Sequence, residues 1–397
     1  MELTILSRPM TAPLEVVERK GRGHPDTLAD GLAEELSVRY CLYTRERFGS
    51  VLHHNFDKVG LLGGASDARL GEGQMLAPIR VLLNGRASAR FGNEVIPLPT
   101  LLQEWATGFL TRELPMLDPD RHLIFHDNVS SANTAGYPAA DFSPQSLADL
   151  FQTRQTLSSD TATVCIQYPP TPVETMVLGV EQHLTSDLYR DRRPWLGSDI
   201  KVMACGSASG VSITACVPQI ADYVPDLQTY QANLESVRAD IQSLVEQHLP
   251  GARVDVRLNT LDDFERGSLY LTVLGSCIES GDEGMVGRGN RSSGFISVLR
   301  PFSGEAACGK NPVFFPGKVY TAVGTEVARR LHEASGARID VWLMSQEGRP
   351  LSDPWKVIVW HDGGALAEAT VREVLGDVLT RIPALTEAML RREIRLC

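Results

Sequence analysis

The chain has 397 residues, of which 43% are hydrophobic and 22% charged, and its formal net charge is −11 at pH 7. This composition is typical of a globular protein, and the length suits two or three core-sized units or one large α/β body. Because the chain is acidic and has no block of basic residues, it should have no nucleic-acid partner and no affinity for an anionic membrane surface.

No apolar run approaches the roughly 20 residues that a membrane span requires, and no basic segment precedes a long apolar run at the N-terminus. The seven cysteines include no Cys-x-x-Cys pair, and no zinc-ligand spacing is present. These features predict a cytoplasmic protein with reduced thiols, no membrane association and no signal peptide.

The first concentration of chemistry is the run Glu-Arg-Lys-Gly-Arg-Gly-His-Pro-Asp at residues 18–26. Leucines at every fourth position from Leu28 predict a helix over residues 27–48, with Asp26 as its N-cap. The free N–H groups of such a terminus favour anions, whereas Asp26 would repel a phosphate unless a metal ion lay between them. The segment therefore suggests a Mg²⁺–polyphosphate site. A Gly-rich turn with solvated charges is an equally good local interpretation.

Strand-like and helix-like segments alternate along the rest of the chain, which indicates an α/β or α+β fold. We expect a strong amphipathic helix at 226–248, a loop over 126–146, and a final helical tail with a break or new first turn at Pro383. The expected strands are 51–54, 79–83, 198–204, 211–217, 254–258, 269–274, 339–344 and 357–360. No linker or repeat separates these elements, so residues 1–397 are expected to form a single body.

Residues 281–318 hold the second concentration of chemistry: the stretches 281–291, 309–312 and 317–318 together contain two carboxylates, Gly-rich turns, two arginines and two lysines. Arginine and lysine both suit phosphate oxygens. The run at 304–311 differs by one residue from a P-loop, but Asn311 has no hydroxyl for Mg²⁺ and is followed by Pro312, so we do not interpret it as one. A solvated loop between strands is the alternative for the whole segment.

The ordered motifs resemble those of one family, the archaeal-type methionine adenosyltransferases (S-adenosylmethionine synthetases). They are spread over most of the chain, and their order is more specific than any single motif. The matching stretches are 18–34, 52–55 with Gly63-Gly64, 85–87, 199–203, Asn259 with 262–266, 270–273, 281–291 and 310–312.

The resemblance implies a catalytic body of three interleaved α/β subdomains around a pseudo-threefold axis, in a homodimer with active sites at the interface. It also implies that methionine attacks C5′ of ATP and that the tripolyphosphate is hydrolysed to phosphate and pyrophosphate, with Mg²⁺ and K⁺ as cofactors. The implied site residues are His24, Lys201, Arg288 and Lys310 for catalysis, Lys20, Gly23, Arg291 and Lys318 for the triphosphate, Asp282 and Glu18 for the amino acid, and Asp26 and Asp57 for metal. No nucleophilic triad is needed, because the reaction requires positioning and stabilisation of a polyanionic leaving group.

The sequence departs from the family pattern at residues 125–133, where a Gly-rich stretch is replaced by polar residues, and at 308–316. These departures leave the motifs on the phosphate side intact. They keep open a diverged enzyme that adenosylates another sulfur acceptor, a triphosphatase, or a non-catalytic regulatory subunit. His53 and His54 are interpreted as structural or substrate-facing residues and not as metal ligands, since neighbours on a strand point to opposite faces.

Overall fold

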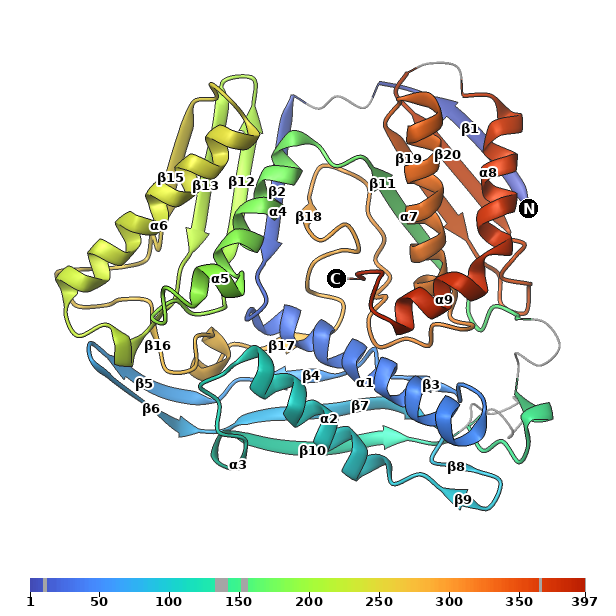
Figure 1. The fold of residues 1–397 in the computed structure, drawn as a ribbon, viewed down its shortest axis with the longest axis horizontal. Helices are drawn as coiled ribbons and strands as arrows, with labels where there is room; N and C mark the ends of the chain where they lie inside the picture. Colours follow the sequence, from blue (N-terminus) through green and yellow to red (C-terminus); the bar gives the residue numbers. More distant parts are fainter. Residues whose placement is uncertain (10–12, 133–141, 151–155, 364–365, 397) are drawn as a thin grey trace.

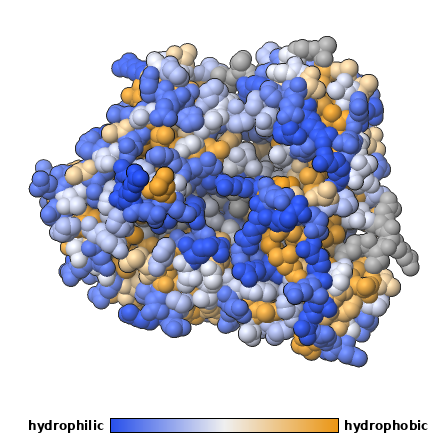
Figure 2. All heavy atoms as spheres, in the orientation of Figure 1, coloured by the Kyte–Doolittle hydropathy of each residue, from blue (hydrophilic) through white to orange (hydrophobic). Residues whose placement is uncertain are grey.

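The computed structural model describes residues 1–9, 13–132, 142–150, 156–363 and 366–396. Three mixed sheets, each covered by helices, make up most of it (Figure 1). In Figure 1 the covering helices all lie on the near side of their sheets. The same face is mostly hydrophilic, with hydrophobic atoms in small scattered groups (Figure 2).

The first sheet carries α1 and α2 and has the strand order β10-β7-β4-β17, with β3 paired to β7. Its elements are α1 (Pro25–Phe48), β3 (His54–Asn55), β4 (Gly60–Leu62), β7 (Ile79–Ala87), α2 (Leu98–Glu113), β10 (Leu123–Ser130) and β17 (Gly284–Met285). Leu28, Leu32 and Leu36 of α1 are fully buried against Val81 and Leu83 of β7 in one core. The predicted leucine periodicity therefore defines the face of α1 that packs on the sheet.

The second sheet has the order β15-β13-β12-β2-β18 and is covered by α4 and α6. Its elements are β2 (Leu14–Lys20), α4 (Pro172–Leu184), β12 (Lys201–Ser207), β13 (Gly210–Cys216), α6 (Leu227–His248), β15 (Val254–Leu258) and β18 (Ile296–Ser297). Side chains of β12 alternate, so that Val202 and Ala204 are buried while Met203 and Cys205 are exposed on the helix-free face. One face of the sheet thus packs on helices and the other is open.

The third sheet has the order β1-β20-β19-β11 and packs against α7 and α8. Its elements are β1 (Glu2–Ser7), β11 (Thr163–Tyr168), α7 (Pro316–Ser335), β19 (Ile339–Met344), β20 (Lys356–His361) and α8 (Glu368–Thr380), followed by α9 (Ile382–Leu390). Shorter elements complete the fold: β5 (Ala65–Arg69), β6 (Glu72–Ala77), β8 (Arg90–Phe91), β9 (Glu94–Val95), α3 (Pro119–His122), α5 (Asp187–Arg190), β14 (Gln219–Ile220) and β16 (Leu271–Thr272).

Each sheet together with its helices is here called a unit, and the chain passes between the three units several times. Strand β1 belongs to the third sheet, where it pairs with β20 from the far end of the sequence, whereas β2 belongs to the second sheet and α1 covers the first. Three large hydrophobic clusters, one per sheet, form the core. The predicted mixed α/β fold is confirmed. The pseudo-threefold relation and the assignment of 1–397 as one body stay predictions. No helix in the described ranges is long and apolar enough to cross a membrane.

Several predicted elements differ from those observed. The stretch 126–130 is expected to be loop but belongs to β10, because its backbone pairs in parallel with β7. Most of the remaining expected loop, residues 133–141, lies outside the described residues. Of the expected strand 269–274, only Leu271 and Thr272 pair with a neighbour. The helix 226–248, the hairpin of β19 and β20, and the new first turn at Pro383 are confirmed.

His54 is buried beside the first core, and its surroundings predict a stability that depends on pH. Its Nε2 lies 2.8 Å from Ser37 Oγ, and its Nδ1 lies 3.1 Å from the Leu52 carbonyl and 3.2 Å from Asn311 Nδ2. Burial lowers the pKa of His54 from 6.5 to about 3. The unfolded chain therefore binds a proton at this position below pH 6.5 that the folded chain excludes until about pH 3, and stability is lost as pH falls through this window.

We expect unfolding free energy to drop by about 2 kcal/mol between pH 7 and pH 5 on account of this histidine. Urea unfolding at the two pH values measures the drop. His54→Gln should be less stable at pH 7, because hydrogen bonds are altered, but its stability should fall less on acidification. An equal drop in both proteins would show that His54 is not responsible.

Candidate active site

The N-terminus of α1 is capped by His24. The helix begins at Pro25, and His24 Nδ1 accepts the Asp26 N–H at 3.1 Å. This corrects the prediction that Asp26 is the N-cap: proline fits the first helical position, so the cap falls one residue before it. Burial lowers the pKa of His24, opposed by the charge of Asp199. The imidazole is therefore neutral near pH 7, and since Nδ1 accepts, Nε2 carries the proton and can donate it in a hydrogen bond.

The turn that precedes α1 contains Gly21 and Gly23, which pack too closely against residues 198–200 to leave room for a side chain. A Cβ at Gly23 would lie 2.1 Å from Ser198 Oγ, and one at Gly21 would lie 2.4 Å from the Ile200 carbonyl oxygen. Gly21 and Gly23 also donate their N–H groups to Ile200 and Ser198. The expected role of Gly23 in triphosphate binding stays a prediction, while its packing against the 198–200 segment is what the structure shows.

Three carboxylates at every fourth position of α1 hold the loops of the site. Asp26 accepts the Met285 N–H at 3.1 Å and pairs with Lys20 Nζ at 2.9 Å. Asp30 accepts the N–H groups on both sides of Arg288, from Gly287 at 2.7 Å and Gly289 at 3.0 Å. Since residues i, i+4 and i+8 share one helix face, α1 presents a row of acceptors to the chain that crosses it.

The third carboxylate of this row is Glu34. It accepts the Gly309 N–H at 3.1 Å, and its two oxygens lie 2.7 and 2.8 Å from Lys318 Nζ. Lys318 is fully buried and also donates to the Lys310 carbonyl. The geometry therefore supports a structural role for Lys318, and the predicted contact of its ammonium with phosphate would require displacement of Glu34.

Around His24 the structure gathers residues from three segments. Lys20 of β2 lies directly opposite Lys201 of β12 in the sheet. Lys201 Nζ lies 3.3 Å from Glu18 Oε1. Lys20 also donates to the Arg288 carbonyl at 2.7 Å, which brings the second motif against the first. Arg288 itself is exposed. The predicted catalytic residues His24, Lys201 and Arg288 are thus held in one neighbourhood by elements that are distant in sequence.

Asp199 is a member of this neighbourhood that the sequence interpretation left without a role. It is 2% exposed, accepts the Cys277 N–H at 3.0 Å and the Tyr270 hydroxyl at 3.3 Å, and faces the charges of His24 and Asp282. Burial raises its pKa. The sequence did indicate Asp199, because it is the first residue of the family motif 199–203 that contains Lys201. Asp282 is exposed, and its Oδ2 accepts a hydrogen bond from the Cys277 thiol with an Sγ–Oδ2 distance of 3.0 Å.

Lys310 forms a second cationic group. Its Nζ lies 2.7 Å from Glu305 Oε2, 3.8 Å from Asp57 Oδ2 and 4.2 Å from the centre of the Phe315 ring. Lys310 is 5% exposed. Asp57 also pairs with Lys58 at 2.7 Å. Predicted phosphate and metal ligands, Lys310 and Asp57, therefore meet here, whereas Arg291 lies elsewhere, in a central cavity that also borders Asp30.

The residues present fit a divalent cation only in part. Although burial alone would raise the pKa of Asp26, the Lys20 ammonium and the Met285 N–H hold it below its usual value, so the carboxylate is ionised at neutral pH. Within the described ranges, no cluster of three or more His, Cys, Asp or Glu forms a complete protein cage for a metal. Single carboxylates such as Asp26 and Asp57 are nevertheless how Mg²⁺ is held when phosphate oxygens supply further ligands.

The two departures from the family pattern have different surroundings. Exposed Asn128 of β10 donates to Asn84 Oδ1 at 2.9 Å, and Asn84 donates to the Lys58 carbonyl at 2.9 Å, next to Asp57. Cys308 and Phe314, in contrast, are 2% and 4% exposed and belong to the packed interior. Both departures nevertheless adjoin a predicted ligand residue, because the second contains Lys310, whose Nζ lies 4.2 Å from the centre of the Phe315 ring. Six cysteines within the described part of the chain are free thiols.

Comparisons with known proteins identify the family of the chain. Residues 4–393 match the model of the S-adenosylmethionine synthetase family. An S-adenosylmethionine synthase of Pyrobaculum aerophilum is 35% identical over 393 residues, covering 96% of each chain, and one of Methanocaldococcus jannaschii is 38% identical over 352 residues, covering 86% of this chain and 84% of the relative. A probable S-adenosylmethionine synthase of Aquifex aeolicus is 37% identical, covering 96% of this chain and 94% of the relative.

A solved structure described as an unusual S-adenosylmethionine synthetase from Campylobacter jejuni superposes with a TM-score of 0.60 at 14% identity, covering 96% of this chain and 89% of that one. At this identity the likeness concerns the fold alone, which is the mixed α/β arrangement of the three sheets. The match over almost the whole chain, with relatives at about 35% identity, is the stronger finding. The chain therefore belongs to the S-adenosylmethionine synthetase family.

Proposed function

We propose that the protein is an ATP:methionine S-adenosyltransferase that forms S-adenosylmethionine and hydrolyses the tripolyphosphate to phosphate and pyrophosphate. The observation that carries this proposal is the row of carboxylates on α1, which draws Lys20, the Arg288 turn and the Gly309-Lys310 turn to one side of a helix whose N-terminus carries His24. Such a concentration of cations and N–H groups in an acidic protein suits a polyphosphate leaving group.

In the proposed reaction the methionine sulfur attacks C5′ of ATP. The C5′–sulfur bond forms as the C5′–oxygen bond breaks, the sulfur becomes a sulfonium, and the triphosphate leaves with the electron pair. A thioether carries no proton, so no general base is needed, and the protein supplies orientation and stabilisation of negative charge. The neutral His24 would donate its Nε2–H to the departing oxygen, with Lys20, Lys201, Arg288 and Lys310 near the phosphates and Asp282 and Glu18 toward the amino acid.

Mg²⁺, when bound, would supply positive charge between phosphate oxygens and carboxylates such as Asp26 and Asp57. The family uses ATP and generally needs a divalent metal; Mg²⁺ in particular, and K⁺ as a monovalent cofactor, belong to the proposal. We expect activity to fall below detection in excess chelator and to return on addition of Mg²⁺, because the carboxylates would otherwise oppose the triphosphate. Comparable methionine-dependent turnover with and without chelator would contradict this.

The direct test is formation of S-adenosylmethionine from ATP and methionine, measured together with release of phosphate and pyrophosphate. Hydrolysis of added tripolyphosphate without any methionine-dependent product would instead favour a triphosphatase. A non-catalytic regulatory subunit would show neither activity alone. It is the weaker alternative, since all the residues expected on the phosphate side are present.

A second candidate is a family member that adenosylates another sulfur acceptor. It is favoured by the polar residues at 125–133, which in the structure connect through Asn128 and Asn84 to the backbone beside Asp57. Polar groups placed to bind a substrate can discriminate by about 10⁴-fold. We expect kcat/KM for methionine to be lower than for some related thioether or thiol, and a panel of acceptors tests this. Methionine as the best acceptor of the panel would show that these changes are neutral.

We further propose that two copies pair through the helix-free faces of the sheets, so that active sites lie between subunits in a cytoplasmic homodimer. The supporting observations are that Lys201 begins the strand whose Met203 and Cys205 are exposed on that face, and that Arg288 and Asp282 are exposed. The free thiols accord with a reducing compartment. Light scattering of the purified protein, together with recovery of activity on mixing two inactive variants altered at different site residues, tests the shared site.

A further inference from the structure

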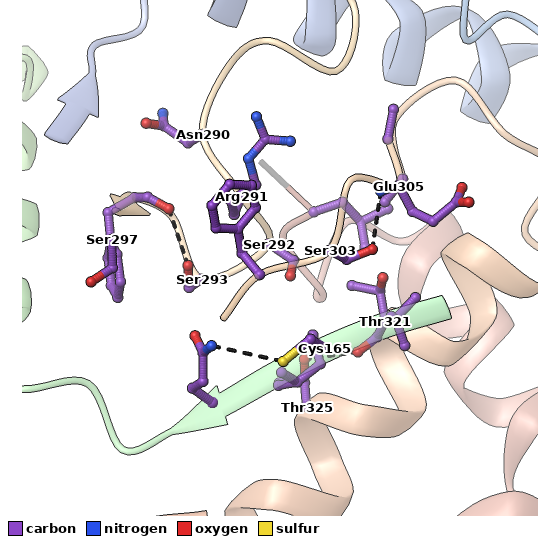
Figure 3. A pocket seen from close by; sticks show the side chains of 18 of the residues that line it. Cys165, Asn290, Arg291, Ser292, Ser293, Ser297, Ser303, Glu305, Thr321 and Thr325 are labelled. Carbon is purple, nitrogen blue, oxygen red and sulfur yellow. Dashed lines mark hydrogen bonds between the residues drawn. The ribbon is translucent and has the colours of Figure 1, made fainter. Parts of the chain in front are cut away.

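A cavity of about 280 Å³ lies where the three units meet, and it is not part of the proposed substrate site. Its walls come from β11 and α7 of the third unit, Leu178 of α4, Asp30 of α1 and the segment 287–308. Figure 3 shows Arg291 and the serines of this segment on one wall, with Cys165 of β11 and Thr321 and Thr325 of α7 on the wall that faces them.

Arg291 is the positively charged group of this cavity. Its Nε is buried without a hydrogen-bond partner, and no carboxylate of the described residues lies within 4.0 Å of its guanidinium nitrogens. The guanidinium lies 5.5 Å from the centre of the Phe302 ring. Asp30 interacts with Arg291 through its charge but forms no ion pair with it. A guanidinium that is partly removed from water and forms no ion pair favours an anion.

The two acids of the cavity wall limit which anion fits. Asp30 is engaged by the Gly287 and Gly289 N–H groups, and Glu305 Oε2 by Lys310. Burial raises the pKa of Asp30 to about 7, so its carboxylate is fully charged only above that pH, where a polyphosphate would meet two carboxylates for a single arginine. The charge balance therefore favours a monoanion and distinguishes the cavity from a second nucleotide site.

The remaining lining is mainly apolar and is edged by hydroxyl groups. Phe295, Phe302, Tyr168, Ile166 and Leu178 provide much of the apolar surface, and four serines and two threonines are among the polar residues of the lining. Concave sites of this kind, apolar with a few placed polar groups, are typical of small-molecule binding. At about 280 Å³ the cavity lies at the small end of ligand pockets, which have volumes of about 300–1,000 Å³.

We propose that this central cavity is a binding site for a small organic monoanion with an apolar body, whose charged group is held by Arg291. The site is separate from the one for ATP and methionine, although the segment 287–291 borders both. Gly287, Asn290 and Arg291 line the cavity, while Lys20 donates to the Arg288 carbonyl and its backbone is hydrogen-bonded to the Asn290 side chain.

The test uses 1-naphthalenesulfonate, a fluorescent aromatic monoanion, titrated into the full-length protein in the presence of saturating Mg²⁺ and tripolyphosphate. Saturable binding is expected under these conditions, and the neutral 1-naphthalenesulfonamide should bind at least about tenfold more weakly, because it has the same shape without the charge. Arg291→Gln should weaken binding of the sulfonate by a similar factor and leave the sulfonamide unchanged.

Thr325 provides a variant that blocks the cavity without touching the core. It is exposed on α7 at the cavity wall, so Thr325→Trp should fill the space and abolish binding, while the matched Thr325→Val should bind as the unaltered protein does. Displacement of the sulfonate by tripolyphosphate would place it in the substrate site and overturn the proposal. Equal binding of the two naphthalene compounds, or full binding by Thr325→Trp, would overturn it as well.

Discussion

Replacing Lys310 by alanine is expected to lower kcat by about 10²–10³, with a much smaller change in ATP affinity. Its ammonium is buried beside Glu305 and Asp57, in a turn fixed to α1 through Gly309 and Glu34. Lys310 Nζ has a single carboxylate oxygen within 3 Å, unlike Lys318 with three oxygens, so it can exchange this partner for the charge that develops on the leaving triphosphate. Its contribution then belongs to the transition state more than to binding. Steady-state kinetics with ATP and methionine, together with equilibrium binding of ATP, separate the two effects.

Lys58 supplies the matched control for this variant. Its ammonium also pairs with Asp57, at 2.7 Å, but the Lys58 side chain is 69% exposed. Lys58→Ala should therefore change kcat by no more than a few-fold, since an exposed ion pair contributes little. If Lys310→Ala behaved like Lys58→Ala, Lys310 would be a structural lysine that neutralises Glu305.

Asp30→Asn is expected to lower kcat by about 10–100-fold. Asp30 accepts two N–H groups that flank Arg288, and an asparagine can satisfy only one of them with its single oxygen, while its NH₂ group opposes the other. Burial raises the pKa of Asp30 to about 7, so the two proteins are compared above that pH, where Asp30 is ionised. A lost charge-assisted hydrogen bond then costs about 1.5–3 kcal/mol, which corresponds to this range if the turn must be in place for reaction. Asp30 would thus act as a positioning residue for Arg288.

Glu35→Gln distinguishes this role from a general effect on α1. Glu35 is 2% exposed on the same helix, but it binds Arg39 at 2.9 Å and Arg392 at 2.6 Å, away from the Arg288 turn. Both variants should lower thermal stability, whereas only Asp30→Asn should lower kcat at saturating substrates. A similar loss of kcat in both, or full turnover by Asp30→Asn, would contradict the positioning role.

Some residues of the candidate site could be predicted from sequence motifs and others could not. Lys20, His24 and Asp26 could be found from sequence because they are contiguous with two glycines and the start of a helix. Asp30 and Glu34 could not, because at every fourth position of α1 they read as ordinary helix charges until their N–H partners, 257 and 275 residues away, are known. The same limit applies to Lys318, whose charge suggested phosphate but is taken by Glu34.

The sequence by itself determined the mixed α/β class, the buried face of α1, the extent of α6 and the hairpin of β19 and β20, because hydrophobic periodicity and the residues at helix ends act within a few positions of the chain. Tertiary structure alone decided that residues 126–130 form a strand, since their backbone groups are satisfied only by β7. It alone decided that the segment 287–291 lies between the Lys20 backbone and a central cavity, where the Nε of Arg291 has no hydrogen-bond partner among the described residues. Such contacts join residues that are far apart in the sequence. Local sequence patterns act over a few positions and therefore do not predict which units will contact one another.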